Sequence, residues 1–66
     1  MNLLLNGEAS TAPEGATVAA FLEFLGLPMK GVAVERNREI VPKSAYGVTR
    51  LTEGDRIEIV QFVGGG

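Results

Sequence analysis

A single amphipathic helical segment, flanked on both sides by strand-forming residues, most limits the folds open to this chain. Its apolar residues recur at the spacing of one helix face, at Val18, Phe21, Leu22 and Leu25. Thr17 is placed to cap the first turn, and Gly26 and Pro28 end the segment, because glycine accepts positive φ and proline cannot continue a helix. The sequence therefore predicts one short helix that covers one face of a sheet.

The residues before this helix predict a β-hairpin. Leu3 to Leu5 form a continuous apolar run, which is typical of a strand buried on both faces in the middle of a sheet. Asn6-Gly7 is the dipeptide best suited to a type I′ turn, because both positions need positive φ. We therefore expect Glu8 to Thr11 to run back antiparallel to the first strand.

A second hairpin is expected directly after the helix. Val32 to Arg36 and Glu39 to Val41 are strand-forming, and Asn37-Arg38 between them predicts a tight reversal. Pro42 then removes a backbone donor and ends the second strand. Both strands are expected to be short.

The remaining residues predict a connection and a last strand. The stretch 43–50 has weak periodicity and indicates an irregular or single-turn segment, with Tyr46 and Val48 as candidates to fill the core. A turn at 53–55 follows, and 56–63 is rich in β-branched and aromatic residues. The last strand is therefore expected to run from Arg56 to Val63.

This order of elements predicts an α+β fold with a mixed sheet of four to five strands and one helix packed across it. A right-handed crossover through the helix sets the first and last strands side by side and parallel at the centre. A chain of 66 residues has room for one modest core. We expect one domain at 1–63, followed by a flexible glycine tail at 64–66.

Composition argues against a self-contained enzyme. The chain has no cysteine and no histidine, which removes the usual zinc ligands, the usual general base near neutral pH and every Ser-His or Cys-His arrangement. Six acidic residues are scattered rather than grouped as metal ligands, at Glu14, Glu23, Glu35, Glu39, Glu53 and Asp55. We expect these to lie on the solvated surface and the chain to bind no cofactor or metal.

Charge disfavours nucleic acid and membrane partners. The formal net charge is -2 and the pI is about 4.9, without a clustered basic footprint. Four cations could form a weak basic edge, although ordinary surface charge explains them as well, at Arg36, Arg38, Lys43 and Arg50. The apolar start at 1–5 lacks a basic flank and is far too short for a signal or membrane segment. The expected location is the cytoplasm.

The most specific feature is the run Gly64-Gly65-Gly66 directly after the last strand. Without side chains, this backbone can enter a narrow channel and present the carboxylate of Gly66 to another protein's site. A carboxylate is ionised at neutral pH and is a poor electrophile, so its use requires activation, most simply as an acyl-adenylate made from ATP. The alternative is an ordinary frayed end.

The last strand carries apolar residues on both faces. Ile57 and Ile59 share one face, whereas Val60 and Phe62 share the other. One interpretation is an apolar docking patch of Val60 and Phe62 beside the tail. The alternative is that the helix covers the face near Ile57 while a bulge or loop buries Phe62.

The whole chain resembles the ubiquitin-like sulfur carriers, through Gly54-Asp55, Ile57, Ile59, Val60 and the final Gly65-Gly66. Within that group it is similar to the ThiS family of thiamine biosynthesis, through the start Met1-Asn2-Leu3, the stretch Ile40-Val41-Pro42 and the end Gln61-Phe62-Val63. The family usually has a larger residue before its Gly-Gly, where this chain has Gly64. This resemblance implies a β-grasp fold.

The resemblance also implies a carrier function. An E1-like adenylyltransferase, using ATP and magnesium, would activate the carboxylate of Gly66, and a persulfide or sulfide donor would convert it to a thiocarboxylate. Gly64 and Gly65 would thread into the partner, and the sulfur would go to thiazole synthase. Two alternatives remain at this point: a carrier for molybdopterin synthesis, and a ubiquitin-like interaction module or protein modifier.

Overall fold

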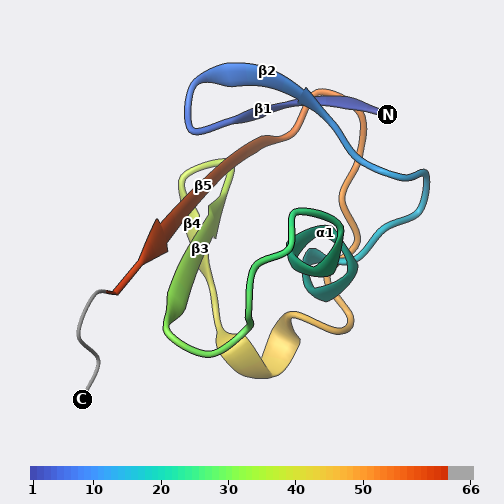
Figure 1. Cartoon of the computed structure of the whole chain (residues 1–66). Coiled ribbons are helices and arrows are strands. Elements are labelled where there is room, and N and C mark those ends of the chain that lie inside the picture. The colour runs from blue at the N-terminus through green and yellow to red at the C-terminus, as the bar shows by residue number, and fades with distance from the viewer. Residues whose placement is uncertain (63–66) are drawn as a thin grey trace.

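The computed structural model describes residues 1–62 and contains a five-stranded sheet and one α-helix. Its strands are β1 (Asn2–Leu5), β2 (Glu8–Thr11), β3 (Val32–Arg36), β4 (Glu39–Val41) and β5 (Arg56–Gln61), and the helix is α1 (Val18–Phe24). The spatial order is β2-β1-β5-β3-β4, with β5 at the centre (Figure 1). On one side β5 pairs in parallel with β1, as the crossover argument predicts, and on the other side it pairs antiparallel with β3.

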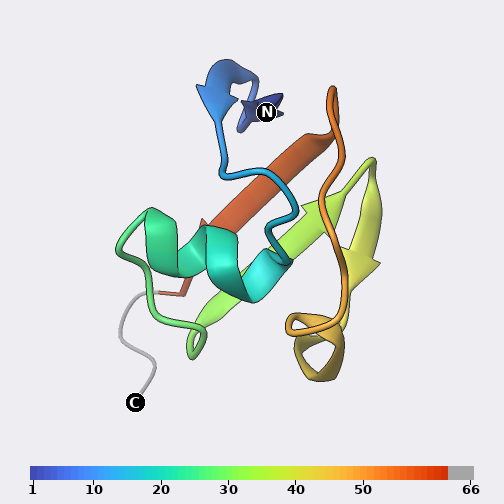
Figure 2. The same cartoon turned by 90° about the vertical axis from the view of Figure 1, so that its right-hand side faces the viewer.

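The helix packs across one face of this sheet (Figure 2). Its first turn is capped by Thr17, whose hydroxyl accepts a hydrogen bond from the Ala20 N–H at 3.1 Å. Its last turn closes as a Schellman motif: the N–H of Leu27 bonds the carbonyl of Leu22 at 2.8 Å, and Gly26 adopts φ +76°. The predicted start and end of the helix are confirmed.

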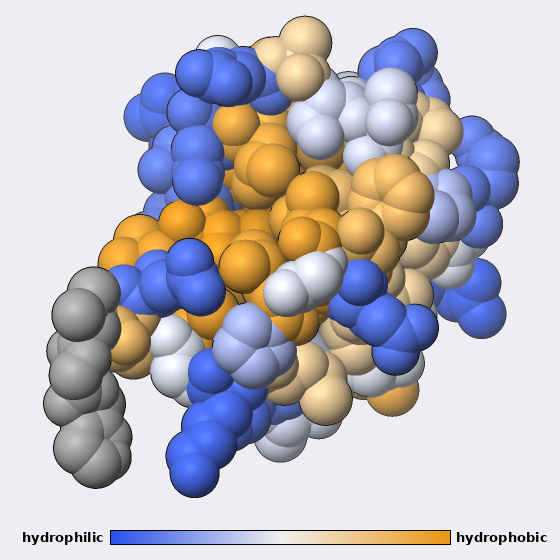
Figure 3. Space-filling model, in the orientation of Figure 1, coloured by the Kyte–Doolittle hydropathy of each residue, from blue (hydrophilic) through white to orange (hydrophobic). Residues whose placement is uncertain are grey.

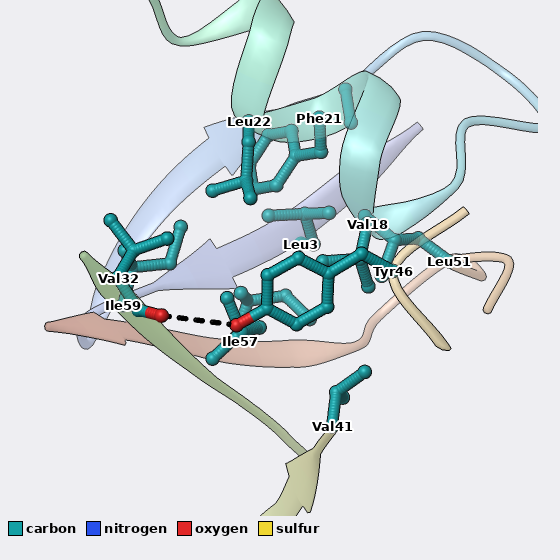
Figure 4. Close-up of a cluster of buried hydrophobic side chains, with 12 residues drawn as sticks. Leu3, Val18, Phe21, Leu22, Val32, Val41, Tyr46, Leu51, Ile57 and Ile59 are labelled. Carbon is teal, nitrogen blue, oxygen red and sulfur yellow. Dashed lines mark hydrogen bonds between the residues drawn. The ribbon is translucent and has the colours of Figure 1, made fainter. Parts of the chain in front are cut away.

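The core lies between α1 and the covered face of the sheet (Figure 4). Its most deeply buried large side chains come from the helix and the two strands beneath it, namely Phe21, Leu22, Ile57, Val18 and Val34. Tyr46 is also buried, and its hydroxyl donates a hydrogen bond to the carbonyl of Val32 at 3.2 Å. A buried phenol therefore has the partner that its polar group requires.

Three predictions about local structure need correction. Leu3 is buried but Leu4 and Leu5 are half-buried, because the single helix covers only one face of the sheet; β1 is therefore not buried on both faces. Val48 is 78% exposed and fills no part of the core. The last strand ends at Gln61 and excludes Phe62, whereas its predicted end at Val63 lies outside the described residues.

The two predicted hairpin turns are confirmed. Asn6 and Gly7 have φ of 51° and 84°, and Asn37 and Arg38 have φ of 52° and 70°. The connection after Pro42 contains a short 3₁₀ helix at Lys43–Ala45, in line with the expected single turn. Among the described residues, the one α-helix has seven residues, so no helix is long enough to cross a membrane.

Candidate functional site

The candidate site lies at the C-terminal end of β5, which we call the β5 terminus and define as Ile59–Phe62. β5 is held between β1 and β3, so the chain leaves the sheet from its central strand (Figure 1). Gly64, Gly65 and Gly66, and the boundary expected between a domain at 1–63 and a tail, lie outside the described residues. The structure therefore describes the root from which the glycines continue.

The two faces of β5 differ sharply in exposure. Ile57 and Ile59 face the core and are 1% and 9% exposed, whereas Val60 is 57% and Phe62 is 62% exposed. The alternative in which a bulge or loop buries Phe62 is therefore wrong. Val60 and Phe62 form an exposed apolar pair on the face that α1 does not cover, immediately before the tail.

The backbone of the β5 terminus is fixed on its β3 side. Val60 lies opposite Ala33 in the antiparallel ladder. The N–H of Phe62 then donates to the carbonyl of Gly31 at 2.8 Å, which extends the pairing one residue past the strand. The exposed side chains of Val60 and Phe62 are thus presented by a backbone that the neighbouring strand holds in place.

A side chain from the first hairpin holds the other side of this terminus. The Oδ1 of Asn6 accepts a hydrogen bond from the Ile59 N–H at 2.8 Å, and its Nδ2 donates to the Ile59 carbonyl at 3.3 Å. The Asn6 amide thereby replaces a backbone partner at the point where β1 has ended. Sequence reasoning assigned Asn6 only to its turn, because nothing local indicates a partner 53 residues away.

The opposite end of β5 is anchored by a buried carboxylate, Asp55, which is only 5% exposed. The expectation that this residue lies on the solvated surface is wrong. Its two oxygens accept hydrogen bonds from four groups: the Arg36 guanidinium at 2.8 Å, the Asn37 amide at 3.1 Å, and the Thr52 N–H and hydroxyl at 2.8 and 3.0 Å. Arg36 is therefore committed to an internal ion pair and is not part of a free basic edge.

These contacts set the protonation of Asp55. Burial alone would raise the pKa of Asp55, but the hydrogen bonds from Arg36, Thr52 and Asn37 outweigh it and lower the pKa below its ordinary value of 3.8. Asp55 is therefore ionised at neutral pH and serves as a structural anchor. Within residues 1–62, no group of three or more acidic side chains comes together as a metal site would require.

Hydrophobic surface surrounds the β5 terminus on the side of α1 as well. Figure 3 shows hydrophobic side chains gathered over the C-terminal half of β5 and continuing toward the helix. Phe24, on the exposed side of α1, contributes a further large apolar side chain that is 56% exposed. The end of the molecule from which the glycines continue is thus markedly apolar.

Comparison with known proteins identifies the family. The family model described as the ThiS family matches residues 3–66. The chain belongs to the ThiS family. The sulfur carrier protein ThiS of Bacillus subtilis is 43% identical over 65 residues, which cover 97% of this chain and 98% of that protein.

A solved ThiS structure has the same fold. The crystal structure of the thiamine biosynthesis protein ThiS from Geobacter metallireducens superposes with a TM-score of 0.84 at 36% identity, and the match covers 100% of both chains. This agreement confirms the β-grasp fold, with its mixed sheet of five strands and one helix.

Another relative is much longer. A thiazole synthase from Paramagnetospirillum magneticum is 50% identical to all 66 residues, and this chain spans only 20% of its length. A thiazole synthase from Magnetococcus marinus matches in the same way at 46% identity. In these relatives, a ThiS-like segment is part of a longer polypeptide.

Proposed function

We propose that this chain is a sulfur carrier for thiazole formation in thiamine biosynthesis, in which the carboxylate of Gly66 carries the sulfur. The observation that carries this proposal is the family match over residues 3–66, which includes the terminal glycines as well as the folded domain. The chain itself acts as a co-substrate of partner enzymes and catalyses no step. Its expected place of action is the cytoplasm.

The proposed chemistry proceeds in two steps on the Gly66 carboxylate. An E1-like adenylyltransferase transfers AMP from ATP to the carboxylate, with magnesium on the triphosphate, and pyrophosphate leaves. Sulfide then attacks the acyl carbon and displaces AMP, which yields the thiocarboxylate directly. A persulfide donor displaces AMP to give an acyl disulfide instead, and a second thiol of the partner cleaves that S–S bond, which releases the thiocarboxylate and leaves a disulfide on the partner. The chain needs no histidine, cysteine or metal for these steps, because the partner enzymes supply the reactive groups.

The proposed sulfur acceptor is thiazole synthase. Two relatives named thiazole synthase contain a segment similar to the entire chain. A carrier and the enzyme that uses its sulfur gain effective concentration when they are joined in one polypeptide. This arrangement supports thiazole synthase as the partner that removes sulfur from Gly66.

The proposed docking surface for these partners includes Val60 and Phe62. Both side chains are more than half exposed, Val60 on β5 and Phe62 one residue past its end, where the backbone is paired with β3. Large apolar side chains that are exposed close together commonly mark protein interfaces. Gly64 and Gly65 would then pass into the partner's channel and bring Gly66 to the reacting atoms.

The deciding experiment is the intact mass of the chain after incubation with ATP, magnesium, sulfide and an E1-like adenylyltransferase of the ThiS pathway. Exchange of one oxygen for sulfur, located in the C-terminal peptide, is the expected result. Conjugates to lysine would instead support a protein modifier. An unchanged mass with an enzyme that loads another ThiS protein would overturn the proposal.

Two variants test the role of the tail. A chain with one alanine added after Gly66 should gain no sulfur, because the activated carboxylate is displaced. Gly65→Trp should slow sulfur gain while the thermal unfolding curve stays unchanged, because the added ring comes after the last strand β5 (Arg56–Gln61) and its core residues Ile57 and Ile59. Sulfur gain by the untrimmed extended chain would contradict Gly66 as the reacting residue, and an unaffected rate for Gly65→Trp would contradict threading.

A further inference from the structure

The two edges of β5 are paired to different extents near its end. The N–H of Phe62 points toward β3, where it donates to Gly31, so the alternation of an antiparallel ladder directs the backbone groups of Gln61 to the opposite side. Ile57, four positions earlier, shows the same alternation: its carbonyl accepts a hydrogen bond from the Asn6 N–H on the β1 side at 2.8 Å. Gln61 therefore presents its N–H and carbonyl toward β1.

On that side β1 has already ended. Its register with β5 consists of Leu4 opposite Arg56 and Leu5 opposite Ile57. The Asn6 amide then occupies the N–H and carbonyl of Ile59. In the described part of the chain, no segment pairs with this edge beyond Asn6, and Gln61 is exposed. Figure 1 shows β5 continuing past the turn that joins β1 and β2.

We propose that this open edge at Gln61 is a strand-docking site for the E1-like adenylyltransferase that takes up the glycine tail. An extended backbone segment of that enzyme would accept a hydrogen bond from the Gln61 N–H and donate one to its carbonyl, adding a strand to the sheet. Addition of a peptide strand to an exposed sheet edge is an established mode of recognition. This inference rests on the proposed function.

The length of the tail supports the same enzyme as the occupant. The reacting Gly66 comes four positions after Phe62, which is at most about 14 Å of extended chain. The enzyme that holds Gly66 must therefore lie against the β5 terminus itself. Because the three glycines offer no side chains, the enzyme can recognise them only through their backbone. Gln61 presents the same kind of backbone groups on the open side of β5.

Asn6 gives this docking site a fixed starting point. Its amide already satisfies the backbone of Ile59, so a docking strand cannot pair further toward the start of β5. Pairing of the docking strand therefore begins at Gln61, which fixes its register on β5. The docking strand cannot slide along the edge, so the number of residues between the start of pairing at Gln61 and Gly66 is constant.

The test compares Gln61→Pro with Gln61→Ala. Proline removes the N–H, which makes no bond to β3, so the ladder is retained; alanine removes the side chain and keeps the N–H. We expect about tenfold weaker binding to the E1-like adenylyltransferase for Gln61→Pro, and binding within about twofold of wild type for Gln61→Ala. Equal binding by both variants, each with a wild-type unfolding curve, would overturn the inference.

Amide hydrogen exchange of the unmodified chain provides a test that requires no substitution. The Gln61 amide should exchange rapidly in the free chain and become protected in the complex, whereas the Ile59 amide should be protected in both. Rapid exchange of Gln61 in a complex that still loads sulfur would reject strand docking and leave the carrier function intact. Failure of the wild-type chain to gain sulfur would reject the proposed function and, with it, this inference.

Discussion

The two ends of β5 are built in opposite ways. At its start, the buried Asp55 carboxylate accepts four hydrogen bonds from Arg36, Asn37 and Thr52. At its end, Val60 and Phe62 are more than half exposed, and the Asn6 amide is the last described partner on the β1 side. One strand thus combines an internal polar anchor with an apolar, accessible terminus.

This difference separates stability from recognition within the short stretch from Asp55 to Phe62, which contains β5. Asp55 anchors the start of β5, and the backbone of its end is held by Gly31 and Asn6. The exposed side chains of Val60 and Phe62 therefore need no packing of their own. An exposed apolar side chain that contributes little to folding remains available to a partner. Substitutions at the anchored start should therefore change the free energy of unfolding, and substitutions of the exposed side chains at the end should change binding.

The largest expected effect on stability comes from Asp55→Asn. The amide keeps the size of the side chain but removes the negative charge that pairs with Arg36. Its NH₂ group is a donor, so it faces other donors and can accept none of their hydrogen bonds. We expect the free energy of unfolding to fall by about 2–3 kcal/mol, measured by urea denaturation at pH 7. Glu23→Gln makes the same chemical change on the exposed side of α1 and should shift it by less than about 0.5 kcal/mol.

Acid should weaken the same anchor in the unmodified chain. Because the pKa of Asp55 is lower in the folded state than its ordinary value of 3.8, the unfolded state binds the proton more readily. The stabilisation is complete above that value and is lost as pH falls through the folded-state pKa. Unfolding midpoints measured from pH 6 to pH 2 should fall more steeply for wild type than for Asp55→Asn, and parallel curves would contradict the assignment.

A smaller effect is expected from Asn6→Gly, which leaves positive φ available in the turn and removes only the amide. Loss of its two hydrogen bonds to Ile59 should cost about 1 kcal/mol, measured by thermal unfolding. Asn6→Asp retains the acceptor for the Ile59 N–H but places a carboxylate oxygen against the Ile59 carbonyl, so it should also be destabilising. An unchanged midpoint for both variants would show that Asn6 does not hold the β5 terminus.

The features that could be predicted from the sequence are those encoded by neighbouring residues. The Asn6-Gly7 turn, the Thr17 cap and the Gly26 ending of α1 each depend on the conformational preferences of a few adjacent positions. The parallel pairing of β1 with β5 followed from the handedness of the crossover. Local chemistry and chain topology were thus sufficient for the order and pairing of the elements, but not for which faces are buried.

The anchors of β5 could not be predicted, because their partners are distant in sequence. Asp55 meets Arg36 across 19 positions, and Asn6 meets Ile59 across 53. Their pairing depends on strand register, which periodicity does not specify. Periodicity did place Val60 and Phe62 on one face, but it could not decide between burial and exposure, because that depends on which face the single helix covers.

The smallest stability effect is expected at the exposed end, from Val60→Ala. This change removes two methyl groups that are largely in water, so the free energy of unfolding should change by less than about 0.5 kcal/mol. Ile57→Val, three positions earlier in the same strand, removes one buried methyl group and should cost about 0.5–1.5 kcal/mol. Both values can be measured by urea denaturation.

Binding should reverse this order. Val60→Ala combined with Phe62→Ala removes most of the exposed apolar pair and should weaken association with the adenylyltransferase by about tenfold or more, whereas Ile57→Val should leave the affinity of the folded chain unchanged. Titration calorimetry with the enzyme at a temperature where all variants are folded measures this directly. If the double variant binds as well as wild type, the exposed face of the β5 terminus is not a docking surface, and contact must come from its open edge and the tail alone.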